Sequence, residues 1–430
     1  MKRLPILILI LLSAGISEAQ SPDKLLAEKI LENENFEKVN ALGNEILKSG
    51  FNAGSGYSEV WIRDLNTFLV YSCRVRPQKE VRDALMPFFF AQGFDGNIID
   101  GYQAPGNNIK IDNYHVFSRY DMPGYALHKN TVETDQETSL IQAIYKYIKE
   151  TGDESILKEE VNGLTVMERL EYALDFLMKY RTSEEYELIW GATTADWGDV
   201  QPGHSWGVKR DEYTTPAIDI YDNAMFLIAL ENLMDLSDDK TKIDTWDKLH
   251  TKISQGVRKH LYDKENEKFI PHIYTTCSPF SGFDENEIYY HGGTAVAIEA
   301  GLLSHEEIGI AIDKMKKNVE MSGAMSIGLT LYPTYPKNSY HKIGMNPYSY
   351  QNGGDWTWFG GRMITQLVRN GYIEEAYNEL QPFINRVVEN DGFFEWYTIE
   401  GKPNGSGVFR GSAGVLMEAI EELQKWAHNQ

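Results

Sequence analysis

Apolar residues recur at spacings of three and four along much of the chain, which places them on one face of an α-helix. In residues 140–148, Leu140, Ile144 and Ile148 share such a face. Gly152 follows this segment, and glycine readily adopts the left-handed conformation that ends a helix. The same periodicity predicts helices in seven further segments: residues 166–180, 222–234, 245–261, 293–300, 360–368, 373–388 and 412–426.

The alternation of apolar and polar residues that is typical of a half-buried β-strand is rare in this chain. Residues 268–274 are the best short candidate. Loops rich in Gly, Asp, Trp and Tyr separate the predicted helices: residues 54–64, 191–206, 278–293, 347–358 and 391–409. No repeat of fixed length is present, which favours a closed array of helical hairpins over an open solenoid. We therefore predict an all-α fold, an (α/α) barrel with its functional loops at one end.

The beginning of the chain has the composition of a secretory signal peptide. The basic pair Lys2-Arg3 precedes an apolar run over residues 4–12, and small residues follow. This run is too short to cross a bilayer, which takes roughly 20 apolar residues. No cysteine follows directly that could carry a lipid. We expect residues 1–19 to be removed and residues 20–430 to form one secreted or periplasmic domain without a membrane anchor.

The charge balance and the cysteines exclude several classes of partner. The chain has 41 Lys and Arg residues against 63 Asp and Glu residues, a formal net charge of −22. Binding of nucleic acid requires a positive face, so no nucleic-acid partner is expected, and strongly anionic polysaccharides are disfavoured as substrates. Cys73 and Cys277 either pair or remain free, and no Cys/His cluster has the spacing of a zinc site. We expect neither a metal nor an organic cofactor.

The first motif with chemical potential lies ahead of a helical segment and contains Trp61, Arg63 and Asp64. A guanidinium and a carboxylate together form a planar arrangement that hydrogen-bonds sugar hydroxyls, and an indole can stack on the sugar ring. An internal salt bridge that caps the next helix would use the same residues. The sequence leaves both interpretations open.

The second motif contains Asp196, Trp197 and Asp199 in a loop with glycine. A general acid must hold its proton at the working pH, and two carboxyls beside an indole provide a crowded, desolvated setting that raises a pKa. The alternative interpretation is an Asx-type turn that precedes a helix.

The third motif surrounds Glu395 with aromatic residues, among them Trp396. A buried carboxylate without a partner is costly, so it usually has either a function or a salt-bridge partner. Glycoside hydrolysis needs a pair of carboxyls, one to protonate the leaving oxygen and one to activate water. Asp199 or Asp196 could form such a pair with Glu395, but only the fold can bring them together.

Three further candidates have a structural explanation that is equally good or better. His291 either presents its ring to a sugar hydroxyl or is a loop histidine with its hydrogen bonds satisfied. Arg410 either orients Glu395 or serves as a cation at the start of a helix. Asp135 either binds a sugar or caps the helix that follows it.

The order of these motifs resembles the clan of (α/α)6-barrel, or six-hairpin, glycosidases, which includes trehalase, processing α-glucosidase, neutral invertase and the glucosidase domain of glycogen-debranching enzymes. Residues 61–64 resemble the W-x-R-D sugar-binding motif of the clan, and residues 135–153 its D-x-x-x-x-L…Y…TGD hairpin. Residues 350–356, which include Trp356, are similar to the Y-x-N-G-x-W loop of invertases. The most specific match is residues 394–416, which resemble the ending E-x-Y…G…G…F…S-x-G-x-L.

The resemblance implies an (α/α)6 toroid that hydrolyses an α-linked oligosaccharide by an inverting, exo-acting mechanism. It implies that Glu395 is the general base and that an Asp is the general acid. The acid motif departs from the clan, because Asp196 precedes Trp197 and Asp199 follows it by two positions; we favour Asp199. The residues expected to bind the sugar are Trp61, Arg63, Asp64, Asp135, Trp197, His291, Trp356, Trp396 and Arg410.

Three alternatives remain at the level of sequence. A phosphorylase of the same architecture would use phosphate in place of water and would need no general base. That alternative leaves the position of Glu395 among aromatic residues unexplained. An unsaturated uronyl hydrolase needs a basic pocket, which the acidic composition disfavours. A non-catalytic glycan-binding protein would use the aromatic residues but has no need of two isolated acids.

Overall fold

The computed structural model describes residues 21–106, 116–204 and 208–430. The predicted signal peptide, residues 1–19, lies outside the described residues. Within the described ranges the chain forms thirteen α-helices joined by loops that carry short antiparallel strands. The all-α prediction is therefore confirmed.

Six helices pack side by side into a closed inner ring. Each contacts the next along the chain, and the last returns to the first, since α13 packs against both α11 and α3. The inner helices are α3 (Ile62–Val75), α5 (Asp135–Thr151), α7 (Ile220–Leu236), α9 (His291–Glu299), α11 (Thr357–Arg369) and α13 (Arg410–His428). This closed ring is the toroid that the sequence predicts.

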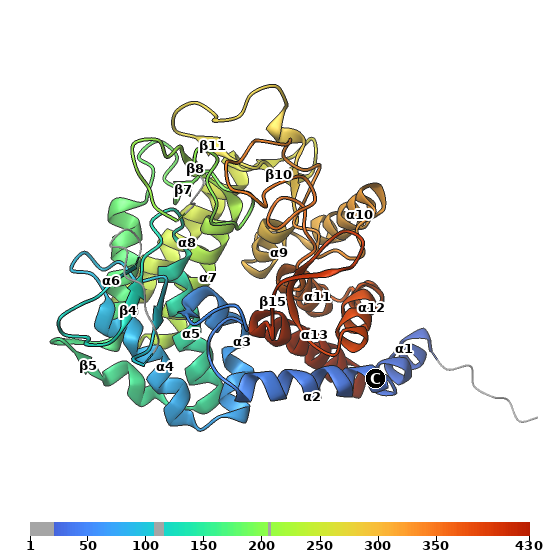
Figure 1. The fold of residues 1–430 in the computed structure, drawn as a ribbon, viewed down its shortest axis with the longest axis horizontal. Helices are drawn as coiled ribbons and strands as arrows, with labels where there is room; N and C mark the ends of the chain where they lie inside the picture. Colours follow the sequence, from blue (N-terminus) through green and yellow to red (C-terminus); the bar gives the residue numbers. More distant parts are fainter. Residues whose placement is uncertain (1–20, 107–115, 205–207) are drawn as a thin grey trace, which may run out of the picture.

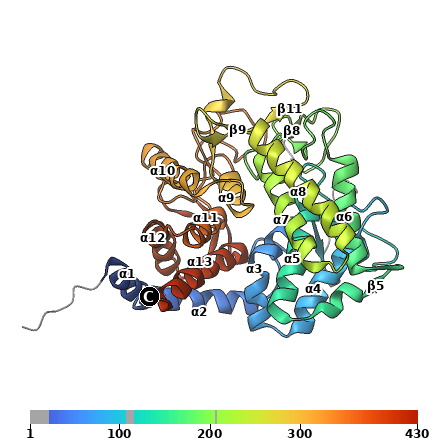
Figure 2. The ribbon, with the colours of Figure 1, turned by 180° about the vertical axis from the view of Figure 1, so that it is seen from behind.

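Six outer helices alternate with the inner ones along the chain and cover them from outside (Figure 1). Figure 2, the view from behind, shows the outer helix α8 against α7. The outer helices are α2 (Glu34–Lys48), α4 (Gln78–Ala91), α6 (Val166–Tyr180), α8 (Lys240–His260), α10 (His305–Ser322) and α12 (Ile373–Glu389). A further helix, α1 (Pro22–Leu31), packs against α13 near the end of the chain.

Burial explains why periodicity identifies some helices better than others. The outer helix α8 buries a narrow stripe, Trp246, Ile253 and Val257, as its amphipathic pattern predicts. The inner helix α7 is enclosed by α5, α8 and α9 and buries nearly every residue of its first three turns. The predicted helix 166–180 coincides with α6. Gly152 ends α5 with φ of 71°, so the predicted left-handed end is confirmed.

Short antiparallel strands lie between the helices, mostly where a segment enters an inner helix. One sheet has the order β1-β2-β4-β3, a second has the order β11-β8-β7, and pairs form between β12 and β13 and between β14 and β15. The strands of these sheets are β1 (Val60–Trp61), β2 (Gly101–Gln103), β3 (Val116–Phe117), β4 (Ala126–His128), β7 (Gly191–Ala192), β8 (Pro216–Ile218), β11 (Ile273–Tyr274), β12 (Tyr289–Tyr290), β13 (Leu331–Tyr332), β14 (Phe394–Tyr397) and β15 (Pro403–Gly407).

Two further pairs involve segments outside these sheets. β5 (Glu160–Val161) pairs with β6 (Leu164–Thr165), and β9 (Tyr262–Asp263) pairs with β10 (Lys268–Phe269). The prediction of one strand over residues 268–274 is wrong, because β10 and β11 lie in different sheets. Pro271 separates them and has no N–H to donate to a continuous ladder.

The fold answers the question of whether the two cysteines pair. Cys73, partly buried in α3, and Cys277, exposed in a loop, are both free thiols. In the part of the chain that the structure describes, no helix is long and apolar enough to cross a membrane.

Candidate active site

A pocket of about 370 Å³ opens where the inner helices begin. Its polar side chains come from the first turns of inner helices and from the strands and loops that lead into them. The pocket is lined by Ala53, Gly56, Tyr57, Glu59, Trp61, Arg63, Asp64, Asp100, His128, Trp197, Asp199, Val208, Lys342, Tyr350, Gln351, Trp356, Trp358, Glu395 and Phe409. The predicted gathering of long loops at one end of the barrel is thus the origin of the pocket.

The pocket brings together two of the predicted catalytic carboxylates, Asp199 and Glu395, which lie far apart in the sequence. Asp199 lies in the loop between β7 and β8, and Glu395 lies on β14 just ahead of α13. The two groups interact electrostatically, because the charge of Asp199 raises the pKa of Glu395. Closure of the ring explains why Asp199 and Glu395 lie in one pocket, since it places the first residues of all six inner helices around one axis.

Glu395 is almost entirely buried, and both of its oxygens accept hydrogen bonds. The Tyr57 hydroxyl donates to Oε1 over 3.0 Å, and the Ser406 backbone N–H donates to Oε2 over 2.8 Å. Burial raises the pKa of this carboxyl above its usual range, while these two hydrogen bonds and the cation of Lys342 oppose the rise. The carboxylate is held in one orientation by donors on both sides.

Asp199 has a single hydrogen bond among the described residues, from the Gln351 side-chain amide to Oδ1 over 2.8 Å. Gln351 belongs to the loop between β13 and α11, which also supplies Lys342, Tyr350 and Trp356 to the pocket. The hydrogen bond therefore connects two loops that enter the site from different hairpins. None of the described residues donates to the second oxygen of Asp199, which can therefore accept from a ligand.

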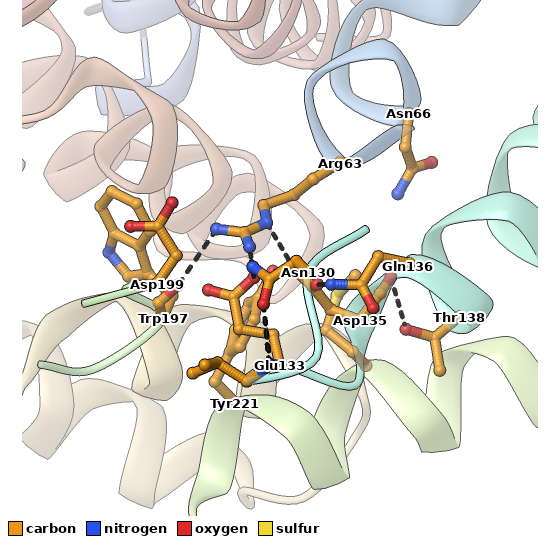
Figure 3. Close-up of polar contacts among 12 residues, drawn as sticks. Arg63, Asn66, Asn130, Glu133, Asp135, Gln136, Thr138, Trp197, Asp199 and Tyr221 are labelled. Atoms are coloured by element: carbon orange, nitrogen blue, oxygen red, sulfur yellow. Dashed lines mark hydrogen bonds and ion pairs between the residues drawn. The ribbon is translucent and has the colours of Figure 1, made fainter. Parts of the chain in front are cut away.

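Arg63 lines the pocket and is fixed by three partners (Figure 3). Its guanidinium pairs with Glu133, pairs with Asp135 over 2.6 Å, and donates to the Trp197 carbonyl over 3.3 Å. Asp135 also accepts from the Tyr221 hydroxyl over 2.8 Å. Both interpretations of Arg63 hold. Its side chain lines the pocket, and it also forms internal salt bridges with Glu133 and Asp135.

Two carboxyls whose pKa depends on Arg63, that of the buried Asp64 and that of the partly buried Asp100, have pKa values near neutrality. Burial raises the pKa of Asp64 and of Asp100 to about 7 each, and the positive charge of Arg63 moderates both rises. Asp64 Oδ1 has no hydrogen-bond partner although it is buried at the pocket. A buried acceptor of this kind is costly unless a ligand satisfies it, and a sugar hydroxyl is a suitable donor.

Aromatic rings form the remaining walls. Trp61 packs edge-on against His128 at a centroid distance of 4.9 Å. Trp197 packs against Trp356 at 4.7 Å and against Trp358 at 5.3 Å. Faces of this kind pack against the apolar C–H surface of a sugar ring.

Asp196 and His291 do not line the pocket. The buried Asp196 carboxyl accepts from the backbone N–H groups of Gly292 and Gly293 over 2.7 and 2.8 Å, and thereby caps the first turn of α9. Burial raises its pKa to about 8 against the effect of these hydrogen bonds. His291 is buried between the Ile327 carbonyl and the Asn318 amide, and burial lowers its pKa to about 4.

Asp135, Trp396 and Arg410 also lie behind the pocket rather than on its surface. Asp135 positions Arg63, as described above, and Trp396 packs against Tyr350 at a centroid distance of 6.3 Å. Arg410 donates to the carbonyls of Ile46 and Asn52 over 3.1 and 2.6 Å, so it secures the chain after α2 and has no hydrogen bond to Glu395 among the described residues.

Several polar residues line the pocket although the sequence did not predict them as site residues: Tyr57, Glu59, Asp100, His128, Lys342, Tyr350 and Gln351. Asp100 and His128 enter through neighbouring strands, since the Asp100 N–H donates to the His128 carbonyl over 3.0 Å. The weak signal for Asp100 is its position between the buried pair Ile98–Ile99 and Gly101. Among the described residues no group of His, Cys, Asp or Glu is arranged to hold a metal ion.

Comparison with known proteins identifies one family. The family model described as the catalytic domain of the glycosyl hydrolase 94 superfamily matches residues 43–400. This range contains Asp199, Glu395 and all but one of the other residues that line the pocket. A search of the curated proteins found no match.

Solved structures with a similar fold are distant in sequence. A GH63 mannosylglycerate hydrolase from Thermus thermophilus, in complex with glucose, aligns with a TM-score of 0.65 at 14% identity, over 88% of this chain and 99% of that chain. A rhamnosidase from Klebsiella oxytoca with rhamnose bound aligns with a TM-score of 0.57 at 10% identity, over 90% of this chain and 63% of that chain. At these identities the alignments establish the fold of the barrel.

Proposed function

The chain belongs to the glycosyl hydrolase 94 superfamily, and on that premise we propose that it hydrolyses the terminal glycosidic bond of an α-linked oligosaccharide with inversion of configuration. Family membership makes the chain a glycoside hydrolase and confirms the resemblance to six-hairpin glycosidases at the level of the clan. The observation that carries the more specific proposal is the presence of Asp199 and Glu395 in one pocket, on loops from different hairpins.

Glu395 is suited to activate water as a general base. Its carboxyl is oriented by Tyr57 and by the Ser406 N–H, and its raised pKa makes it a stronger base than an exposed glutamate. Asp199 is suited to protonate the departing oxygen, because it reaches the same pocket and Gln351 fixes one of its oxygens. An acid on one side of the bond and a base that activates water on the other is the arrangement of an inverting glycosidase.

The remaining walls support recognition of a sugar at the end of a chain. Asp64 offers an unsatisfied acceptor, Arg63 is held rigidly behind it, and Trp61 offers an aromatic face. A volume of about 370 Å³ lies at the small end of ligand pockets, which range over about 300–1,000 Å³. This size favours exo action on one terminal residue. We also propose that the protein is exported, on the signal-peptide pattern of its first nineteen residues.

The names of the similar proteins guide the choice of substrates to be tested. The Thermus enzyme is named for mannosylglycerate and the Klebsiella enzyme for rhamnosides. A panel should therefore contain α-linked glucosides, mannosides and rhamnosides with neutral aglycones, together with glycosides of a short acid. Lys342, a cation at the pocket, makes the acidic aglycone a relevant member of the panel.

The test is sugar release from this panel by the protein and by two variants, Glu395→Gln and Glu400→Gln. Glu400 is an exposed residue of the turn that follows β14, so its variant is a matched control for loss of a glutamate. We expect Glu395→Gln to lower kcat/KM by about 10³-fold, a typical contribution of a general base, and Glu400→Gln to leave it unchanged. Proton NMR of the first product should show the β-anomer.

Other outcomes would contradict the proposal in distinguishable ways. A rate that depends on inorganic phosphate, with a sugar phosphate as product, would make the protein a phosphorylase. Retention of the α-anomer would replace the inverting mechanism by a retaining one. Glycan binding without sugar release would show that the protein is a non-catalytic glycan-binding protein.

A further inference from the structure

A second cavity, of about 240 Å³, lies further along the inner helices than the active-site pocket. All six inner helices contribute to its wall, through Asn66, Lys146, Asn232, Glu299, Arg362 and Glu418. On α3 its lining starts at Asn66, directly after Arg63 and Asp64 of the active-site pocket. The two cavities therefore lie one after the other along the interior of the barrel, and no residue lines both.

The lining of this second cavity has more cations than carboxylates. Lys146, Arg362 and Arg369 face Glu299 and Glu418. Arg362 pairs with Glu299 over 2.8 Å, and Arg369 pairs with Glu418 over 2.8 Å and reaches Glu422, outside the lining, over 3.6 Å. Both arginines thus have carboxylate partners.

Lys146 is the exception. Its ammonium donates to the Asn66 carbonyl over 2.9 Å, and within the described part of the chain no carboxylate lies at ion-pair distance from it. An ammonium has three protons to donate, so two remain for a ligand. Burial lowers the pKa of Lys146, and the charges of Glu418 and Glu299, which lie beyond ion-pair distance, oppose the fall without cancelling it.

Two further polar atoms of the lining are buried and have no partner in the part of the chain that the structure describes. Asn66 Oδ1 is an acceptor, and Thr365 Oγ is a hydroxyl that can donate; each residue is 2% exposed. The other side-chain atom of Asn66, its amide nitrogen, donates to Gln142 over 3.0 Å, so the free oxygen is oriented by that bond. Unsatisfied buried groups of this kind are uncommon and point to a missing partner.

We propose that the second cavity binds a small oxyanion that also carries a hydroxyl group, such as hydrogen phosphate or a short hydroxy acid. The anionic oxygens accept from Lys146 and from the Thr365 hydroxyl, and the hydroxyl of the ligand donates to Asn66 Oδ1. This assignment gives partners to Asn66 Oδ1 and the Thr365 hydroxyl, which have none among the described residues, and to the remaining protons of Lys146. The site lies outside the sugar pocket and does not depend on the hydrolytic reaction.

The cations have a competing explanation in the inner helices themselves. The carbonyl ends of helices carry partial negative charge, and the cation Arg369 is the last residue of α11. Lys146 and Arg362 stand more than one turn before the ends of α5 and α11, where this effect has faded. If the cations only balanced helix ends, no anion would bind.

Isothermal titration calorimetry of the full-length mature protein with inorganic phosphate, lactate and acetate tests the proposal. We expect phosphate or lactate to bind and acetate, which has no hydroxyl, to bind at least tenfold more weakly. Lys146→Met should weaken binding at least tenfold and Lys146→Arg should restore most of it. Lys149→Met, which removes an exposed cation from the same helix, should leave binding unchanged.

Two further variants make the test independent of the sugar pocket and of folding. Lys342→Met, which removes a cation from the active-site pocket, should bind the anion as the parent does; loss of binding in this variant together with full binding in Lys146→Met would place the anion in the active site and overturn the proposal. If circular dichroism shows that Lys146→Met is unfolded, Thr365→Val takes its place, and unchanged affinity in that variant overturns the proposal. The proposal is also overturned if neither phosphate nor lactate binds to the parent protein at millimolar concentration.

Discussion

At the scale of single residues, the pocket sets the basicity of Glu395 by opposing effects. Burial and the charge of Asp199 raise its pKa, whereas Ser406, Tyr57 and Lys342 lower it. The result is a carboxylate that is more basic than an exposed glutamate. Of the three groups that lower the pKa, Tyr57 and Ser406 donate hydrogen bonds to Glu395, whereas Lys342 acts through its charge alone. Lys342 can therefore be changed without loss of the hydrogen bonds that orient the carboxylate.

We predict that Lys342→Met raises the pKa of Glu395 further, because the cation that favours the ionised form is lost. A general base works only when deprotonated, so the acid limb of kcat/KM should move to higher pH, and activity should fall at acid pH while it is retained on the alkaline side. A pH profile of kcat/KM measures the shift. Lys337→Met, at an exposed position of the same loop, is the control, and an identical profile in both variants would contradict the electrostatic role.

At the scale of elements, helix starts explain why two neighbouring aspartates have different surroundings. Asp196 faces inward and receives the first N–H groups of α9, whereas Asp199, three residues later, faces the pocket. The backbone at Asp196 has φ of 54°, a left-handed conformation, which turns the loop between the two carboxyls. A sequence that contains two acids around one Trp does not specify this turn.

Asp196→Ala should therefore act on stability and Asp199→Asn on catalysis. Loss of the Asp196 carboxyl leaves two buried N–H groups without acceptors, and we expect the free energy of unfolding to fall by about 2–3 kcal/mol. Asp199→Asn should leave stability nearly unchanged and lower kcat by about 10²–10⁴-fold. Urea denaturation and steady-state rates separate the two effects. The reverse pattern would make Asp196 the acid.

At the scale of the whole molecule, the site exists because the ring closes between α13 and α3. Gly414 lies at this seam, and a Cβ there would come within 2.4 Å of the Thr67 carbonyl and 2.5 Å of the Phe68 Cα. Backbone atoms cannot move aside as a flexible side chain can. The two helices therefore approach more closely than any larger residue permits, which brings Phe409 and Glu395 to the same pocket as Arg63.

We predict that Gly414→Ala forces α13 away from α3 and lowers the free energy of unfolding by about 1–3 kcal/mol or more. The shift should also lower kcat/KM, because the two helices carry opposite walls of the pocket. Gly43→Ala is the matched control, since a Cβ there meets only the flexible end of Met417. Thermal unfolding and sugar release measure both effects. Equal stability of the two variants would show that the seam tolerates a methyl group.

The sequence by itself determined the helical character of this protein and the identity of its most distinctive acid. Periodicity identified α6 to its boundaries, and Gly152 marked the end of α5, because both signals are local. Glu395 could be identified as a candidate because a carboxylate buried among aromatic residues is costly unless it has a partner or a function. These inferences depend only on neighbours along the chain.

The tertiary structure decided which side chains meet. It placed Asp135, His291 and Arg410 behind the pocket, although their residue types suit a sugar site, and it brought Asp100, His128 and Lys342 into the pocket without a clear sequence signal. The physical reason is that six helix starts converge only when the ring closes. Which carboxyl faces the cavity then depends on turns within loops and on backbone contacts between hairpins. The spacing of residues along the chain does not predict either of these.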